Sequence, residues 1–250
     1  MRYFSFSTGD YLFLDNVSLN NNLSLLEIGV GLGSLADLTM GKAKEYCGID
    51  IACDVIDYLK LLYKKNKFIR WYCLDVCKEN SFLNKRFDIV YSAHTLEHVE
   101  SPQGFFNFIK RHLKTDGVAI IIYPNESKNQ HHGISWFNNK KELVGIIDGA
   151  GLEIFTIFEI RETMWHKLVR KIFWEIPKSI ILTSRSKNQP QTFEKTEAFK
   201  ITHSHSIKRN FFAFYAKIIT KLAAIFPLYK YVESEENIQN KTLFIRLKNK

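Results

Sequence analysis

The sequence predicts an α/β fold in which a mostly parallel sheet carries helices on both faces. Between residues 23 and 124, short apolar runs alternate with segments of helical periodicity, and this alternation is typical of a parallel sheet wrapped by helices. The run Val118–Tyr123 is apolar without interruption, as a strand buried on both faces requires. With 250 residues, 46% of them hydrophobic, the chain is long enough to bury one large core.

The expected elements follow one another in a regular order. Strands are expected at Leu23–Ile28, Tyr46–Ile51, Phe68–Leu74, Phe87–Ser92, Val118–Tyr123, Leu152–Ile160 and Thr242–Leu247. Helices are expected at Ser34–Ala43, Val55–Lys64, Phe105–Leu113 and Asn139–Ala150. Thr115, Asp116 and Gly117 are expected to turn the chain into the fifth strand, and Gly151 is expected to stop the last of these helices.

Residues 161–240 interrupt this alternation and are expected to form an insertion. They are basic, aromatic and helical in pattern, with a polar loop around Thr183–Ser206. About 80 residues far exceed an ordinary connection. The sequence therefore predicts one α/β domain, made of residues 1–160 with 241–250, and a helical insertion at 161–240 before the last strand.

The positive charge of the chain belongs to its C-terminal part. The formal net charge is +9, yet residues 161–250 contain 18 Lys and Arg against 7 Asp and Glu. This asymmetry indicates an acidic partner, substrate or membrane surface. Phe211–Phe226 is apolar, but Lys217 and Lys221 interrupt it, and a charge at the bilayer centre costs about 3 kcal/mol. Two alternatives stay open: a lid over an acceptor pocket, or helices lying peripherally on anionic lipid.

The four cysteines are Cys47, Cys53, Cys73 and Cys77. They form no CxxC pair and no metal-binding spacing, and Cys47 and Cys73 fall in expected buried strands, so free thiols are predicted. The N-terminus lacks the apolar run of a secretory signal. A reducing, cytoplasmic location follows, at the inner face of the membrane if the insertion binds lipid.

Residues suited to one ligand stand at four successive strand ends. Gly29, Gly31 and Gly33 follow the first strand and allow a sharp turn and close approach of a ligand. Glu27 just before them can attract an ammonium group, and it would repel a pyrophosphate. A dinucleotide fingerprint would also require glycine where Ser34 stands. The loop therefore favours a cationic ligand.

The next strand ends carry further acids. Asp50 ends the second strand and can accept hydrogen bonds from two ribose hydroxyls, and Asp75 ends the third and can accept from an adenine amino group. Ile51, Val76 and Ser92, which adjoin these strand ends, complete the expected cofactor-binding set. In an open α/β sheet, ligands bind beyond the carboxyl ends of the strands.

These residues resemble the class I S-adenosylmethionine-dependent methyltransferases, especially their small-molecule group. The resemblance covers about residues 20–160 and the final strand, and the stretch from Phe87 to Val99 is also typical of that group. It implies that Glu27 and the three glycines hold the methionine part of S-adenosylmethionine, Asp50 the ribose and Asp75 the adenine. It also implies a Rossmann-like sheet of seven strands with the last one antiparallel.

The segment His94–His98 admits two metal interpretations. It fits the H-x-x-E-H pattern of an inverted zinc-protease motif, but Ser101 and Pro102 soon end the segment, whereas that motif needs a long helix. It is also similar to the E-x-x-E-H motif of ubiquinone-pathway O-methyltransferases, whose acids and histidine bind a divalent metal. Glu97 and His98 match that motif and His94 departs from it. The preferred prediction is no metal, with Glu97 and His98 orienting the loop.

Methyl transfer to a hydroxyl is the expected reaction. A sulfonium methyl is already activated, so alignment and a base near neutral pKa suffice. His94 and His98, together with His132 beside His131, are the candidate bases. The predicted acceptor is small or lipid-linked. Nucleic-acid methylation is the alternative, disfavoured because no [DN]-P-P-[YF] loop follows the fourth strand, and a non-catalytic cofactor-binding scaffold is another.

Overall fold

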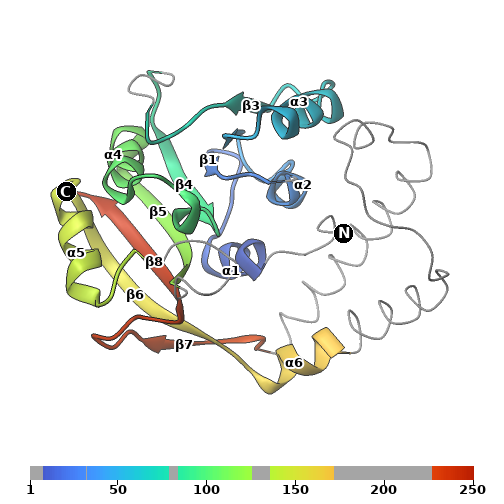
Figure 1. The fold of residues 1–250 in the computed structure, drawn as a ribbon. Helices are drawn as coiled ribbons and strands as arrows, with labels where there is room; N and C mark the ends of the chain where they lie inside the picture. Colours follow the sequence, from blue (N-terminus) through green and yellow to red (C-terminus); the bar gives the residue numbers. More distant parts are fainter. Residues whose placement is uncertain (1–7, 32, 79–83, 126–135, 172–226) are drawn as a thin grey trace, which may run out of the picture. The chain divides into compact units, whose positions relative to one another are not determined.

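A computed structural model describes residues 8–31, 33–78, 84–125, 136–171 and 227–250. Its centre is an eight-stranded sheet with the order β3-β2-β1-β4-β5-β8-β6-β7 (Figure 1). The strands are β1 (Ser24–Ile28), β2 (Glu45–Asp50), β3 (Ile69–Cys73), β4 (Phe87–Ala93), β5 (Leu113–Asn125), β6 (Leu152–Glu162), β7 (Tyr229–Glu233) and β8 (Lys241–Asn249). The predicted α/β class is confirmed, and the sheet has one strand more than expected.

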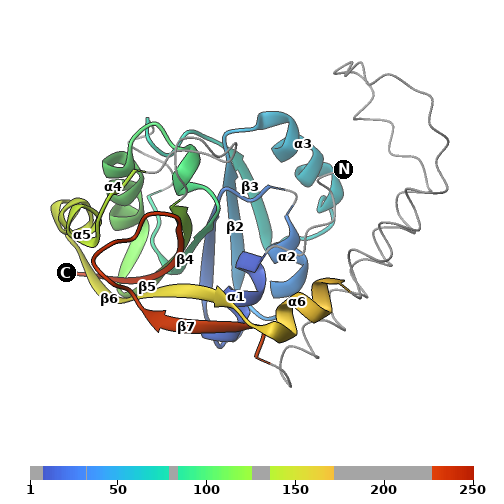
Figure 2. The same ribbon diagram turned by 60° about the horizontal axis from the view of Figure 1, so that its bottom comes forward.

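The strands from β3 to β5 run parallel, and β8 runs antiparallel between β5 and β6. Figure 2 shows the parallel strands side by side. All five residues of β1 are buried, because this strand is central and is paired on both edges. The carboxyl ends of β1, β2, β3 and β4 therefore meet at one edge of the sheet, where ligands bind in open α/β sheets.

Helices cover both faces of the sheet. In Figure 1, α4 and α5 lie on one side and α1, α2 and α3 on the other. Their bounds are α1 (Thr8–Asn16), α2 (Ser34–Thr39), α3 (Cys53–Leu62), α4 (Pro102–His112) and α5 (Lys140–Gly149), and a 3₁₀ turn, η1 (Leu96–His98), follows β4. Helix α4 begins where the Ser101 hydroxyl accepts from the Gly104 N–H at 3.0 Å, with Pro102 in its first turn.

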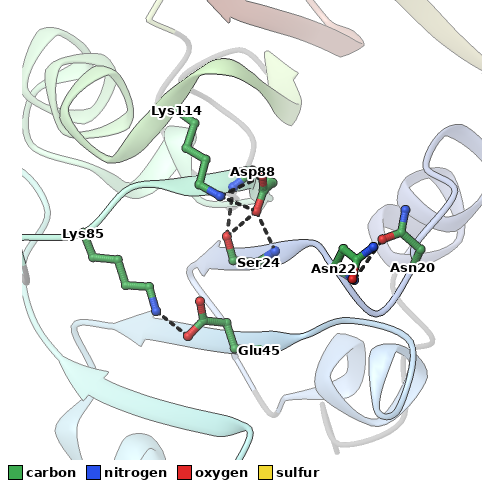
Figure 3. Close-up of polar contacts among 7 residues, drawn as sticks. All are labelled: Asn20, Asn22, Ser24, Glu45, Lys85, Asp88 and Lys114. Atoms are coloured by element: carbon green, nitrogen blue, oxygen red, sulfur yellow. Dashed lines mark hydrogen bonds and ion pairs between the residues drawn. The ribbon is translucent and has the colours of Figure 1, made fainter.

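A polar cluster ties the amino ends of the central strands together (Figure 3). Asp88 accepts hydrogen bonds from the Ser24 N–H at 2.8 Å and from Lys114 Nζ at 2.8 Å, so β1, β4 and β5 share one carboxylate. Glu45 on β2 pairs with Lys85 beside it. This cluster lies at the edge of the sheet opposite the predicted cofactor residues, and its role is structural.

Two predicted elements differ in the structure. The expected turn at Thr115–Gly117 lies inside β5, which begins at Leu113 because Leu113 pairs with Phe87 before the register shifts. The insertion was predicted to be helical, yet β7 begins at Tyr229. Aromatic packing favours this strand. The centroid of the Tyr231 ring lies 6.1 Å from that of Phe158 and 5.7 Å from that of Phe244.

Helix α1 has no counterpart among the predicted elements. Its Leu12 and Phe13 side chains are fully buried, and the Phe13 ring lies 4.6 Å from that of Tyr91 on β4. The helix is therefore held by tertiary packing. A nine-residue segment with a weak apolar pattern gives little local signal for a helix.

The chain divides into two compact units, Met1–Ile160 with Tyr231–Lys250, and Arg161–Lys230. In the second unit the described part contains α6 (Met164–Arg170), which begins at Thr163, whose hydroxyl accepts from the His166 N–H. Within the described residues, no helix is long and apolar enough to cross a membrane. Phe211–Phe226 and most of the predicted insertion lie outside the described residues.

Candidate active site

The glycine loop after β1 adopts a backbone conformation that favours glycine. Gly29, Gly31 and Gly33 have φ values of 78°, 49° and 74°, in the left-handed region that L side chains rarely enter. A Cβ atom on Gly29 would collide with the Thr95 side chain, whereas a Cβ on Gly31 would meet nothing within 4 Å. The loop thus packs tightly against the β4 end at Gly29 and is open at Gly31.

Glu27 places a carboxylate beneath this loop. It is 5% exposed, and the Tyr46 hydroxyl of β2 donates a hydrogen bond to its Oε2. A buried carboxylate needs such partners because charge is costly to remove from water. The result is a fixed negative charge at the carboxyl end of β1, where the sequence predicts the ammonium group of the ligand.

Asp50 fastens the glycine loop to the end of β2. Its Oδ2 accepts from the Gly31 N–H at 3.0 Å, and its Oδ1 accepts from the Ala52 N–H at 3.0 Å. Each carboxylate oxygen keeps a further lone pair for a ligand hydroxyl. The neighbouring Ile51 side chain is 67% exposed, which leaves an apolar surface beside the carboxylate.

Asp75 stands at the end of β3. Its Oδ1 accepts from the Cys77 N–H at 2.9 Å, and its Oδ2 lies 3.2 Å from Lys78 Nζ. The next residue, Val76, is buried. Since β2 and β3 pair in register from Tyr46 to Asp50, the two acid-bearing strand ends are neighbours, as the sequence predicts.

The end of β4 is bound to the end of β1 by two hydroxyl groups. The Ser92 hydroxyl donates to the Ile28 carbonyl at 2.9 Å and is fully buried. The Thr95 hydroxyl is 3.2 Å from the same carbonyl oxygen. Ser92 thus donates to the residue just before the glycine loop, and its predicted role in binding the cofactor stays a prediction.

Glu97 lies between His94 and His98, two of the candidate catalytic bases. It is 2% exposed, and its Oε1 is 3.6 Å from His94 Nδ1 and 4.0 Å from His98 Nε2. Its Oε2 is buried and has no hydrogen-bond partner among the described residues. His94 itself has a φ of 53°, an uncommon conformation for a side chain other than glycine. The backbone after β4 thus directs His94 toward the buried carboxylate.

A second network joins this loop to the segment after β5. The Trp136 ring N–H donates to the Leu96 carbonyl at 3.0 Å, and the Trp136 backbone N–H donates to the Tyr123 hydroxyl at 2.9 Å. The Tyr123 hydroxyl in turn donates to Asn125 at 2.7 Å. Burial raises the pKa of Tyr123, and the charge of Glu97 adds to the rise. Sequence reasoning missed Tyr123, Asn125 and Trp136. Tyr123 and Asn125 belong to the last three residues of β5, whereas Trp136 has no local signal in the sequence.

Two predictions about chemistry are not tested by the described residues. His131 and His132 lie outside them. For a metal, no group of three His, Cys, Asp or Glu ligands forms within the described part of the chain, and Glu97 with His98 supplies only two. The metal alternative therefore stays a prediction.

The prediction of free thiols was wrong for two cysteines. Cys53 and Cys73 form a disulfide with a Cα–Cα distance of 5.0 Å. Cys73 is also exposed, where a buried position was expected. No short spacing in the sequence signals this pair, because the two cysteines are 20 residues apart and come together only when β3 pairs with β2. Cys47 and Cys77 are free.

Comparisons with known proteins agree with this geometry. The methyltransferase domain family matches residues 26–121. The chain is 25% identical over 152 residues to the ubiquinone biosynthesis O-methyltransferase of Rickettsia canadensis, covering 54% of this chain and 64% of that protein. It is 32% identical over 114 residues to the malonyl-[acyl-carrier protein] O-methyltransferase of Acetivibrio thermocellus, covering 45% and 38%. The chain thus spans less than two thirds of the length of these two relatives.

The fold is also shared with solved structures. A proposed methyltransferase from Bacillus halodurans C-125 superimposes with a TM-score of 0.55 and 14% identity, over 96% of this chain and 98% of that one. At this identity the likeness concerns the fold. The family model and the named relatives, and not this likeness, identify residues 26–121 as a methyltransferase domain of the class I S-adenosylmethionine-dependent type.

Proposed function

We propose that this chain transfers a methyl group from S-adenosylmethionine to a hydroxyl group of a small or lipid-linked acceptor. The observation that carries the proposal is the buried Glu97 carboxylate 3.6 Å from His94 Nδ1. His94 adjoins Thr95, which packs against Gly29 of the glycine loop. A supported imidazole thus stands next to the proposed methyl-donor site, where a hydroxyl acceptor needs a base.

The residues at the strand ends fit the donor. Glu27 supplies the negative charge for the ammonium group, and Asp50 has lone pairs for the ribose hydroxyls. Gly31 leaves open space where a side chain would otherwise stand. The exposed Ile51 offers an apolar surface that a flat adenine ring would cover, with Asp75 near its amino group.

In the proposed mechanism, the protein aligns the acceptor with the donor and supplies a base. S-adenosylmethionine, when bound, supplies a methyl group on a positively charged sulfur, ready for in-line displacement by an acceptor oxygen. His94 directs Nδ1 toward Glu97, so Nε2 is the nitrogen that would receive the acceptor proton. Glu97 would then stabilise the imidazolium as a neighbouring negative charge. His98 is farther from Glu97, at 4.0 Å, and more exposed, at 60% against 44%, so we prefer His94.

The same pair of residues supports a hydroxyl group as the proposed acceptor. The two named relatives are an enzyme of ubiquinone biosynthesis and one that methylates malonyl-[acyl-carrier protein]. A malonyl carboxylate is already ionised near neutral pH and needs no base, whereas a hydroxyl does. The Glu97–His94 arrangement therefore favours a hydroxyl acceptor. For residues 161–240, both sequence-based proposals stand, a lid or a peripheral contact with anionic lipid, and liposome flotation separates them.

The test compares two acceptors and two variants. Purified protein is given labelled S-adenosylmethionine with either a prenylated dihydroxybenzene or a malonyl thioester. We expect methylation of the dihydroxybenzene, and a fall of about 10²–10⁴-fold in His94→Gln, with a smaller fall in the matched variant His98→Gln. S-adenosylhomocysteine affinity should stay within about twofold in His94→Gln, since His94 is not proposed to bind the donor.

Three results would contradict the proposal. Methylation of the malonyl thioester alone, unaffected by His94→Gln, would point to a carboxyl acceptor. Equal losses in both histidine variants would remove the special role of His94. Binding of S-adenosylhomocysteine without transfer to a broad panel of hydroxyl acceptors would favour the non-catalytic scaffold.

A further inference from the structure

The Cys53–Cys73 disulfide joins the two strand ends that carry the proposed adenosine-binding acids. Cys53 is the first residue of α3 and Cys73 the last residue of β3. Asp50 lies three residues before Cys53, and Asp75 lies two residues after Cys73. Asp50 and Cys73 are register partners, and the Leu74 N–H donates to the Asp50 carbonyl at 3.0 Å. The cross-link therefore closes the segment from Asp50 to Cys53 against the end of β3.

Both cysteines of the disulfide lie on the surface of the protein. Cys53 and Cys73 are exposed residues, so a small thiol or disulfide can reach them. The other thiols are poor competitors, because burial raises the pKa of Cys47 to about 11 and also raises the pKa of Cys77, and the thiolate is the reactive form. Oxidation is thus directed to one pair.

We propose that Cys53 and Cys73 are a redox pair that controls the affinity of the adenosine-binding edge, with the disulfide form binding the donor more tightly. This inference rests on the proposed cofactor site. The disulfide restrains the segment that holds the Asp50 carboxylate and Ile51 relative to Asp75, so less freedom is lost when the ligand binds. Reduction releases that restraint while leaving the sheet intact.

The chemistry is a thiol–disulfide exchange. A small-molecule disulfide such as oxidised glutathione accepts two electrons. The Cys53 and Cys73 thiols give up two protons and form one S–S bond, while the S–S bond of the oxidant breaks to give two thiols. No other reactant is needed, and the reverse exchange with reduced glutathione restores the two cysteine thiols.

Thermodynamic linkage gives the inference a second, independent observable. If the ligand prefers the disulfide form, it must make that disulfide harder to reduce by the same factor. For a two-electron couple, a tenfold preference lowers the midpoint potential by about 30 mV. Affinity and potential must therefore agree in sign and in size.

The experiment uses the full chain and S-adenosylhomocysteine as the probe. Calorimetry gives the Kd after equilibration with oxidised or reduced glutathione, and alkylation with mass spectrometry gives the midpoint potential with and without the probe. We expect the Kd to rise about tenfold on reduction and the potential to fall by about 30 mV when the probe saturates both forms. The double variant Cys53→Ser/Cys73→Ser should bind like the reduced protein in either buffer, and the matched control Cys77→Ser should keep the full redox response.

Each contrary outcome has a distinct meaning. Equal Kd values in both buffers, or a potential that the probe does not move, would overturn the redox inference and leave the cofactor site standing. A redox response that survives in the double variant would also overturn it. Absence of binding in both buffers would overturn the proposed cofactor site itself, and the inference with it.

Discussion

At the scale of single residues, the proposed role of Glu27 is to favour a cationic ligand over a phosphate ligand. Its side chain is 5% exposed, and Tyr46 donates to it, so the charge is fixed in place before a ligand arrives. A preorganised carboxylate loses little rotamer freedom on binding. Its interaction with an ammonium group is therefore expected to appear almost fully in the measured affinity.

Glu27→Gln should weaken the binding of S-adenosylhomocysteine by about 10–100-fold, as expected for the loss of a charged hydrogen bond. The same variant should bind 5′-methylthioadenosine, which lacks the amino acid part, as well as the wild type does. Asp50→Asn is the matched variant and should weaken both ligands, because both contain the ribose. Calorimetry with the two ligands gives the comparison. Equal losses of both ligands in Glu27→Gln would mean that Glu27 supports the loop and does not contact the ammonium group.

At the scale of elements, local sequence patterns predict the features that depend on neighbouring residues. They do not predict contacts between residues that are distant in the sequence. The strand ends at Glu27, Asp50 and Asp75 were predictable because an apolar run followed by an acid or glycine is a local signal. The pairing of Cys53 with Cys73, and of Trp136 with Leu96 at 3.0 Å, depends on how strands and loops meet in space. Strand β7 was missed for the same reason, since Phe158 and Phe244 lie far from Tyr231 in sequence.

Asp88 joins three strands, and its hydrogen bonds should make the stability of the protein depend on pH. Burial alone would raise the pKa of Asp88, but hydrogen bonds from Lys114 and from the side chain and backbone of Ser24 lower it to about 2. A carboxylate whose pKa is lowered by folding stabilises the protein above its unfolded pKa, which is near 4, and that contribution is lost as the pH falls toward 2. We estimate about 1–2 kcal/mol for this partly screened site.

Asp88→Asn should therefore be less stable than the wild type at pH 6 by about 1–2 kcal/mol, and this difference should fall to roughly a third of that value at pH 2.5, just above the folded pKa of Asp88. Urea unfolding at the two pH values gives the free energies. Asp57→Asn is the matched control, because the Asp57 side chain is 69% exposed and faces an exposed Lys60, and it should change little at either pH. A constant difference between the wild type and Asp88→Asn across this range would contradict the assigned pKa.

At the scale of the whole molecule, the proposed donor site belongs to one of the two compact units. Glu27, Asp50 and Asp75 all lie within Met1–Ile160. The sequence could place this site because each of its elements follows a repeated strand–helix pattern. It could not assign a role to residues 161–240, whose composition fits both a lid and a lipid-binding surface.

Hydrogen exchange with and without S-adenosylhomocysteine tests whether the donor binds to the first compact unit alone. At a ligand concentration of about 100 times Kd, binding adds about 2.7 kcal/mol to the stability of the bound unit, so its slowest amides should exchange up to about 10²-fold more slowly. The strongest local effect is expected at the Gly31 and Ala52 amides, which donate to Asp50. Helix α6 should be unchanged, because the proposed donor site takes no residue from Arg161–Lys230. Equal slowing in α6 would show that the second unit takes part in donor binding and would overturn a donor site built from the first unit alone.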